Sequence, residues 1–345
     1  VYSACQFVAA PLWGRLSDRI GRRTVLMLCY AGTAASYVWL GHVGSLPEMF
    51  ASRAAAGLMA GWLATGQAWV ADTTDDAGRA RGMGLLGAAF GIGFVVGPAL
   101  GAAAVGGEAP NFSLPILMSA AASMLAFVVA AARIREPARH VALAGELGHS
   151  ARRVLSIPVV LLLLIVYFAG YFVFAGMESV LALWVERMLG LGPRHVGLLL
   201  AFAGVCIVIV QGGLVGRLAR RFGEERLVIA GIVVLIAGLL AVPAAGSVWW
   251  MLPAMALLAI GQGLSNPSMQ SLVSRAVPAS WRGATMGSMQ SASSMGRILG
   301  PVWAGFAFSA LGPDWPFFTG ALLLVPALLV AGRAGRISLR RRESG

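Results

Sequence analysis

The chain has 345 residues, of which 58% are hydrophobic and 12% charged, and its mean hydropathy is +0.80. This composition excludes an ordinary soluble globular protein and indicates a chain whose solvent is the lipid bilayer. All 26 basic residues are arginines, against 14 acidic residues, and the lack of lysine excludes a Walker-type phosphate loop, a Schiff-base enzyme and a lysine general base.

Ten apolar stretches are long enough to cross about 30 Å of hydrocarbon, which takes roughly 17–25 helical residues. In chain order they cover residues 24–43, 48–71, 82–105, 112–132, 157–184, 195–216, 226–246, 248–273, 283–309 and 315–332. Residues 1–13 form an eleventh apolar stretch, which at about 20 Å is too short to cross as a helix. The sequence therefore predicts an all-α membrane protein with eleven helical segments.

The arginines orient the predicted helices. Of the 26, 22 lie in alternate connections, which are residues 15–23, 79–81, 133–153, 217–226, 275–282 and 333–342. The opposite connections hold only Arg187 and Arg194. Because positively charged loops stay in the cytoplasm, we expect the first set of connections and the C-terminus there. The clusters are short, without the long basic stripe that nucleic-acid binding requires.

The longest polar stretch divides the hydrophobic sequence into two blocks. We expect an N-terminal helical half over residues 1–132, a cytoplasmic linker over 133–156, a C-terminal helical half over 157–332 and a cytoplasmic tail over 333–345.

The two halves are parallel copies. Residues 14–23 match residues 216–225 at an offset of 202, and a second set of residues recurs at an offset of 203. That set is Gln67, Arg79, Met83, Gly84, Gly93, Gly97 and Pro98, which recur as Gln270, Arg282, Met286, Gly287, Gly296, Gly300 and Pro301. Applied to the helix that begins near residue 157, the offset projects about one helix before Val1. The repeat therefore predicts six helices in each half, with the first one missing here.

The loop over residues 14–23, Gly-Arg-Leu-Ser-Asp-Arg-Ile-Gly-Arg-Arg, lies between the second and third expected helices of the first half. Together with the two parallel six-helix halves, it resembles the signature loop of the major facilitator superfamily. The resemblance covers nearly the whole chain. It implies the major facilitator fold, with a substrate cavity between the halves that opens alternately to each side of the membrane.

The resemblance also implies a cytoplasmic gate, composed of Gly14, Asp18, Arg19, Gly21, Arg22, Arg23 and Asp72. In the family, the counterpart of Asp18 caps the eleventh helix, here near Gly283, and Asp72 would pair with Arg22 or Arg23. Arg220 replaces the acid in the second copy, so we expect that half to latch weakly or differently. The alternative is that these charges only set the topology.

A glycine pattern in the fifth span, Gly93-x-x-x-Gly97-Pro98-x-x-Gly101, resembles the antiporter motif of the superfamily's drug:proton antiporters. This branch includes the tetracycline and multidrug exporters. Glycines four residues apart favour close helix approach, and Pro98 permits a bend. Ordinary helix packing is the alternative interpretation.

Three ionisable residues inside expected helices are assigned to proton coupling, namely Glu178, Arg53 and Arg297. Arg53 begins an Arg-x-x-x-Gly-x-x-x-Gly pattern that resembles the branch's second motif, whose arginine is associated with proton transfer; the alternative is that it snorkels to the interface. Glu178 is the leading proton carrier, with a structural or interfacial role as the alternative. Arg297 neutralises Glu178, attracts an anionic group of the substrate or forms a structural bridge.

Four amide side chains are the candidates for substrate binding: Gln67, Asn266, Gln270 and Gln290. Asn266 is the strongest of them, because Pro267 is expected to break the helix beside it. No cofactor or metal is expected, since the cysteines are isolated and no HExxH or nucleophile-elbow pattern occurs in the sequence.

These features predict a proton-coupled exporter of small amphipathic compounds, not an enzyme, that works as a monomer in the bacterial inner membrane. Its expected partners are a small-molecule substrate, protons and the lipid bilayer, and not nucleic acid. An uptake symporter for a sugar or another metabolite on the same scaffold is the first alternative. A transport-dead receptor or a membrane enzyme is the second.

Overall fold

The computed structural model describes residues 1–74, 76–106, 111–136, 156–277 and 282–343, and within these ranges every element is helical. The chain divides into two compact units, one of Val1–Gly93 with Leu100–Ala144 and the other of Phe94–Ala99 with Gly145–Gly345. Most of the expected linker, residues 137–155, lies outside the described ranges.

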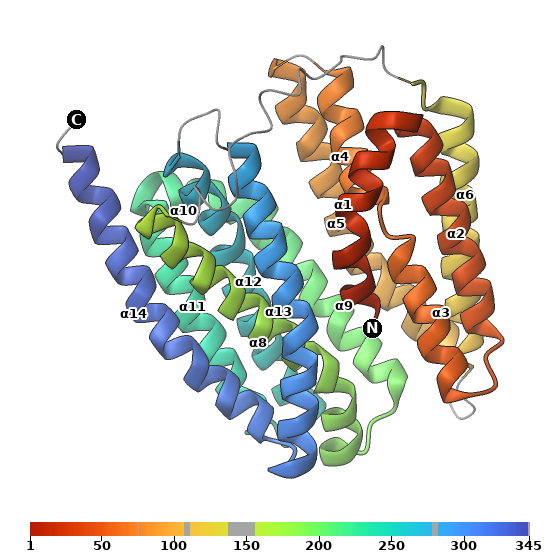
Figure 1. Ribbon diagram of the computed structural model, residues 1–345. Helices are drawn as coiled ribbons and strands as arrows, with labels where there is room; N and C mark the ends of the chain where they lie inside the picture. The colour runs from red at the N-terminus through yellow and green to blue at the C-terminus, as the bar shows by residue number, and fades with distance from the viewer. Residues whose placement is uncertain (75, 107–110, 137–155, 278–281, 344–345) are drawn as a thin grey trace. The chain divides into compact units, whose positions relative to one another are not determined.

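The first unit is built from short and long helices in chain order (Figure 1). They are α1 (Tyr2–Ile20), α2 (Arg22–Gly41), α3 (Leu46–Leu58), α4 (Trp62–Thr73), α5 (Asp76–Val105) and α6 (Ser113–Arg133). α2 packs along α6 and also contacts α3 and α4, while α1 packs against α3. Val25, Leu26 and Cys29 of α2 are fully or almost fully buried.

The span expected over residues 48–71 is two helices, because α3 ends at Leu58 and α4 begins at Trp62. Trp13 of α1 occupies the break. Its indole Nε1 donates a hydrogen bond of 2.5 Å to the Leu58 carbonyl, and a Cβ atom on Gly61 would overlap its side chain. The expectation of one helix was wrong because hydropathy does not register a side chain that enters at a glycine.

The second unit holds the larger core. Its elements are α8 (Pro158–Leu189), α9 (Pro193–Ile209), the π-helical turn η1 (Val210–Leu214), α10 (Val215–Phe222), α11 (Glu224–Ala241), α12 (Val248–Arg275), α13 (Arg282–Ala310) and α14 (Trp315–Glu343). α8 packs against α13 and α14, α11 against α12 and α14, and α9 against α12. Trp184 and Phe317 are the largest fully buried side chains, with ring centroids 5.9 Å apart.

Six helices in the described ranges are long and apolar enough to cross a membrane: Arg22–Gly41, Ser113–Arg133, Pro158–Leu189, Pro193–Phe222, Val248–Arg275 and Trp315–Gly332. When α3 is joined with α4, and α9 with η1 and α10, the described elements form eleven helical segments. The predicted all-α architecture with eleven segments is therefore confirmed.

Two expected helix ends differ in the structure. Pro267 lies inside α12, which continues to Arg275, so the expected break beside Asn266 does not form. A proline in a membrane helix removes one backbone hydrogen bond, and neighbouring helices tolerate that loss. α14 continues through the sequence expected to be a tail and ends at Glu343.

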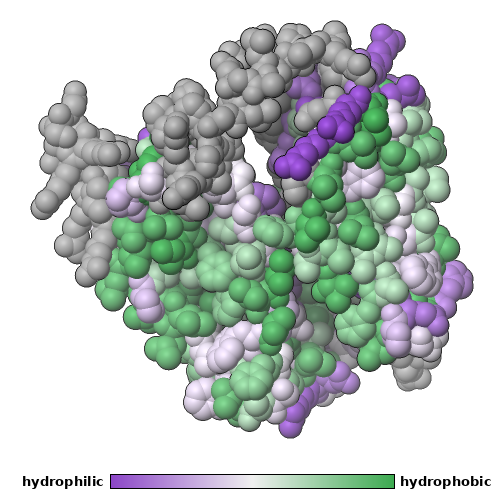
Figure 2. Space-filling view, in the orientation of Figure 1, coloured by the Kyte–Doolittle hydropathy of each residue, from purple (hydrophilic) through white to green (hydrophobic). Residues whose placement is uncertain are grey.

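The surface of the helices is apolar. On the face in Figure 2, hydrophobic side chains cover most of the described helix surface, and hydrophilic ones gather towards the helix ends. At the start of α12, Trp249 and Trp250 are 77% and 70% exposed. Exposed apolar side chains along the helices with tryptophans at one end are typical of a lipid-facing surface.

The turn η1 interrupts the span formed by α9 and α10. Val210 in this turn is buried, and a Cβ atom on Gly263 of α12 would lie 3.0 Å from its Cγ1. π-Helical turns are rare and occur often at functional sites. The sequence contained no signal that distinguished this turn from the helix around it.

Close approach of α8 and α13 depends on glycines. A Cβ atom on Gly296 would lie 2.8 Å from the backbone nitrogen of Phe172, and one on Gly300 would overlap the carbonyl oxygen of the same residue. From the other helix, a Cβ atom on Gly176 would lie 3.0 Å from the Gly300 carbonyl oxygen. The Gly-x-x-x-Gly pair of the second half therefore brings two backbones into contact.

We predict that Gly300→Ala destabilises the protein by about 1–3 kcal/mol, because the added methyl group forces α13 away from α8. The midpoint of thermal unfolding in detergent measures the effect. Gly305→Ala is the matched control in the same helix, since a Cβ atom there meets nothing within 4 Å. Equal midpoints for the two variants would contradict the interpretation.

Candidate functional site

A single glycine joins α1 to α2. Gly21 has a φ of 102° and a ψ of 149°, a conformation that side chains with a Cβ atom avoid. Its counterpart Gly223 joins α10 to α11 with a φ of 84° and a ψ of 154°. A tight turn through glycine is therefore present in both copies. Among the described residues, nothing lies within 4 Å of the Cβ position of Gly14.

Glu136 binds the N-terminus of α2. Its carboxylate accepts hydrogen bonds from the backbone nitrogens of Arg22, at 2.5 Å, and Arg23, at 2.9 Å. A Cβ atom on Gly21 would lie 2.7 Å from the same carboxylate. Because the first backbone N–H groups of a helix have no partner within it and carry partial positive charge, a carboxylate there is stabilising.

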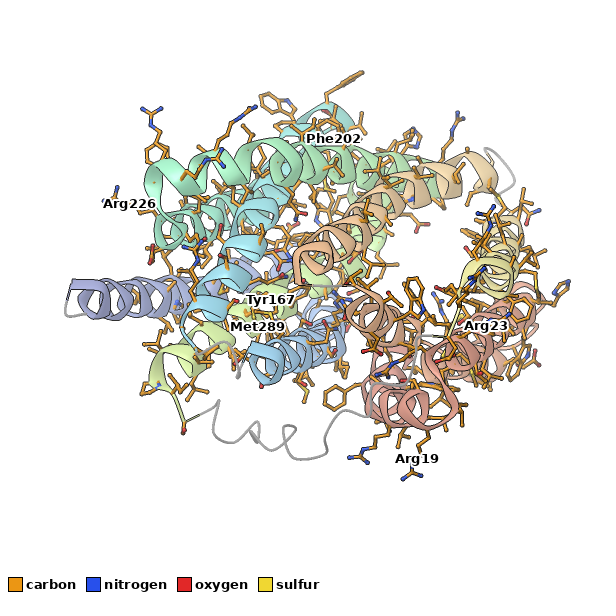
Figure 3. The ribbon with its side chains drawn as sticks, turned by 90° about the horizontal axis from the view of Figure 1, so that it is seen from above. Arg19, Arg23, Tyr167, Phe202, Arg226 and Met289 are labelled. Carbon is orange, nitrogen blue, oxygen red and sulfur yellow. The ribbon has the colours of Figure 1, made fainter. Side chains whose placement is uncertain are left out.

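The gate arginines hold neighbouring helix ends. Arg22 Nε forms an ion pair of 2.9 Å with Asp72 at the end of α4, and Arg22 Nη1 donates to Ser17 Oγ. Arg23 Nη2 donates to the Ala131 carbonyl of α6 at 2.7 Å. Figure 3 shows Arg19 at the edge of the unit, where its side chain is exposed. The side chain of Asp18 lies outside the described part of the chain, so its cap on the eleventh helix stays a prediction.

The glycines of the expected antiporter motif lie on an open face of α5. Pro98 is inside this helix, and the Cβ positions of Gly93, Gly97 and Gly101 meet nothing within 4 Å. The role of this face in close helix approach therefore stays a prediction. Among the described residues no hydrogen bond or ion pair involves Arg53, which is exposed on α3.

Glu178 of α8 lines an apolar cavity of the second unit. The other lining side chains come from α8, α9 and α12, and they are Phe174, Met177, Leu200, Ala203, Ile207, Met255, Leu258 and Ala259. Glu178 also reaches the surface of the unit, where its side chain is exposed. Within the described ranges it forms no hydrogen bond and no ion pair with Arg297 or any other cation within 4.0 Å.

A polar cluster joins α8 to α12. Asn266 Nδ2 donates to the hydroxyl of Tyr171 at 2.8 Å, and Gln270 Nε2 donates to the hydroxyl of Tyr167 at 3.2 Å and to Asn266 Oδ1 at 3.0 Å. The two tyrosine rings are 4.9 Å apart in an edge-on arrangement. Figure 3 labels Tyr167 among the helices of this unit. We call these four residues together with Arg297 the tyrosine–amide cluster.

Arg297 of α13 completes this cluster. Its guanidinium carbon lies 5.0 Å from the centroid of the Tyr171 ring, and its side chain is exposed. A small cavity next to the cluster is lined by the polar side chains of Gln262 and Ser265, which are almost fully buried. The expected substrate ligands Asn266 and Gln270 therefore share one site with Arg297.

Two expected substrate ligands lie elsewhere. Gln67 is exposed on α4 and Gln290 is exposed on α13, and neither has a hydrogen bond among the described residues. The sequence interpretation missed Tyr167 and Tyr171, which lie one helical turn apart on α8. It also assigned Glu136 to a linker, because no local pattern signals a carboxylate that binds a helix distant in sequence.

The comparisons with known proteins agree with this architecture. The family model described as Major Facilitator Superfamily matches residues 1–301 and again residues 212–343. The tetracycline resistance protein of class C from Escherichia coli is 31% identical over 339 residues, which are 95% of this chain and 85% of that protein. The class G protein from Vibrio anguillarum is 31% identical over 353 residues, with 98% and 87% covered.

Two solved structures are also similar. The human organic anion transporter MFSD10 (TETRAN) has a TM-score of 0.68 and 26% identity, over 96% of this chain and 82% of that one. A bacterial homologue of the human lysosomal transporter Spinster, inward-facing and occupied, has a TM-score of 0.77, with 97% and 87% covered. At 17% identity the second similarity concerns the fold alone.

We predict that Glu136→Gln lowers the stability of the first unit by about 0.5–2 kcal/mol, since an amide loses the charge that favours the α2 N-terminus. Hydrogen exchange of the amides of Arg22 and Arg23 and the thermal unfolding midpoint measure it. Glu186→Gln is the control, because Glu186 is an exposed carboxylate on α8. Unchanged protection of the Arg22 and Arg23 amides would contradict the capping role.

Proposed function

We propose that this chain, which belongs to the Major Facilitator Superfamily, exports small amphipathic compounds across a membrane in exchange for protons. Membership makes it a multi-pass membrane transporter of small molecules. The direction of transport, the proton coupling and the chemical class of the cargo are what the proposal adds. Its similarity to a tetracycline resistance protein and to an organic anion transporter supports a drug-like cargo.

The observation that carries the proton coupling is the position of Glu178. Its carboxylate lines a cavity of apolar side chains, and no described residue pairs with it. An ionisable group inside a membrane is costly unless it is paired, and such groups mark proton pathways in transporters. Glu178 is therefore the residue that takes up and releases the proton, with Arg297 of α13 as the cation of the same unit that balances its charge. Arg53 stays a candidate for proton transfer within the first unit.

Cargo and proton exclude each other in this mechanism. Cargo binds at the tyrosine–amide cluster and against the apolar wall beside Glu178, while Gln67 and Gln290 lie outside this site. Binding favours release of the proton, and reprotonation after cargo release resets the site. An inward proton provides about 2.3 kcal/mol for each 100 mV of membrane potential, before any pH gradient, so no ATP is required.

The gate residues control access to the cavity. Arg22, Asp72 and Glu136 hold the ends of α2, α4 and α6 together, while Asp18 caps the eleventh helix in one state of the cycle. The α5 glycines with Pro98 permit the bend that accompanies the change of state. The arginine distribution supports a bacterial inner membrane with the C-terminus in the cytoplasm.

Everted membrane vesicles with an acid interior test the proposal, with tetracycline as the probe. We expect the probe to dissipate the pH gradient across wild-type vesicles, as reported by a pH-sensitive dye. Glu178→Gln abolishes this dissipation, because an amide does not exchange a proton in the transport cycle. Glu186→Gln, on the same helix, leaves it intact.

Normal probe-driven dissipation in Glu178→Gln would place the proton site elsewhere. A response to inwardly directed protons only in right-side-out vesicles, with accumulation of the probe, would indicate uptake by symport instead of export.

A further inference from the structure

The hydroxyl groups of Tyr167 and Tyr171 form a donor site. Each hydroxyl accepts one amide hydrogen bond, from Gln270 and Asn266 respectively. A hydroxyl that accepts a hydrogen bond keeps its own O–H proton to donate, and within the described ranges neither hydroxyl donates one. The tyrosine O–H protons are therefore left for a ligand.

Arg297 adds charge to this donor site. Its guanidinium carbon lies 5.0 Å from the centroid of the Tyr171 ring, within the range of a cation–π contact. Within the described ranges no carboxylate lies within 4.0 Å of it. A guanidinium has five N–H donors in a fork that matches a pair of oxygen atoms, and it has no acceptor.

The cluster therefore has more free hydrogen-bond donors than free acceptors. Asn266 Oδ1 already accepts from Gln270, so the donors that remain are the guanidinium, the tyrosine O–H groups and one N–H of Asn266, against the Gln270 carbonyl as acceptor. Resting on the proposed function, we propose that the tyrosine–amide cluster recognises a delocalised oxyanion, such as a carboxylate, enolate or phenolate, on a planar cargo molecule. The oxyanion pairs with Arg297 and accepts a hydrogen bond from a tyrosine O–H group. The flat part of the molecule packs on the tyrosine rings.

Two dyes with the same three-ring skeleton and opposite charge test this inference: fluorescein, an anion, and rhodamine 123, a cation. Fluorescence anisotropy with the full chain in lipid nanodiscs gives the dissociation constant of each. We expect fluorescein to bind more tightly by about tenfold or more, the equivalent of one charge-assisted hydrogen bond. Arg297→Gln removes the preference, and Tyr171→Phe reduces it.

Arg187→Gln is the matched control, because Arg187 also lies over a ring, that of Phe308, at 5.9 Å, and is outside the cluster. Arg297→Lys keeps the charge without the fork, and we expect part of the preference to remain. Equal binding of the dyes, or the wild-type preference in Arg297→Gln, overturns the inference. Binding is measured without a proton gradient, so loss of antiport with intact fluorescein selectivity would refute the proposed function alone.

A second, independent observation concerns two ion pairs at equivalent positions. In the second unit, Glu224 Oε1 lies 3.1 Å from Arg275 Nη2 and accepts a hydrogen bond of 2.7 Å from Ser271 Oγ. Glu224 stands 202 residues after Arg22, and Arg275 stands 203 residues after Asp72, which are the two offsets of the repeat. The pairs Arg22–Asp72 and Glu224–Arg275 are therefore the same pair with its charges exchanged.

The N-termini of the helices explain the exchange. α2 has no acidic residue in its first turn, and Glu136 supplies the negative charge from outside. α11 has Glu224 and Glu225 in its first turn, and at the positions that correspond to Glu136 the sequence has Ser338 and Leu339. We infer that Glu224 combines two roles that the first half divides, since it pairs with the end of the neighbouring helix and also provides the anion for its own helix.

This inference predicts that reversing the first pair makes Glu136 unnecessary. In the wild-type background, Glu136→Gln lowers the thermal unfolding midpoint. In the Arg22→Glu, Asp72→Arg background, the same substitution raises the midpoint, because Glu136 then faces a carboxylate at position 22. The reversal leaves the summed charge of the two cytoplasmic connections unchanged, so we expect the topology to be preserved.

Arg226→Gln is the control, because Arg226 follows the α11 acids and lies at the edge of the unit in Figure 3. A decrease of the same size after Glu136→Gln in both backgrounds overturns the inference. Separately, Glu224→Arg and Arg275→Glu each lower the midpoint, and the double variant recovers at least part of the loss; no recovery also counts against the pair.

Discussion

The cost of an unpaired charge or an unsatisfied backbone group in hydrocarbon governs this protein. With 12% charged residues, the chain places its ionisable groups almost entirely at helix ends. At those ends the same cost explains the hydrogen bonds of Glu136 to the start of α2 and the two acidic residues, Glu224 and Glu225, in the first turn of α11. Glu178 and Arg297 are among the few ionisable groups elsewhere. Placing a charged side chain inside the membrane costs free energy, which indicates that these residues have a function.

The fold was predictable because it depends on quantities that sequence records directly. The length of apolar stretches, the alternation of arginines and the repeat at offsets of 202 and 203 predicted eleven helical segments in two parallel halves. Gly21 also fits the repeat, because a glycine between two helical stretches permits a tight turn, and the structure has a positive φ there and at its counterpart Gly223.

The site was predictable only in part. Asn266, Gln270 and Arg297 were visible as polar residues in apolar helices, but their connection through Tyr167 and Tyr171 depends on the rotation of α8 against α12. The break at Trp62 and the continuity of α12 through Pro267 were also mispredicted. In both cases a side chain or helix distant in sequence decides whether backbone groups are satisfied, and local patterns do not contain that information.

The π-helical turn η1 has a geometric consequence for the helix that contains it. Such a turn holds one residue more than an α-helical turn, so the side chains that follow are rotated by about 100°. Before the turn, Val196, Leu199 and Ala203 form a buried stripe on α9, whereas α10 after it has no buried residue. The inserted residue thus changes which face of the helix is turned towards its neighbours. The α9 part packs against α12 through apolar side chains, and the α10 part directs Arg217, Arg220 and Arg221 towards water.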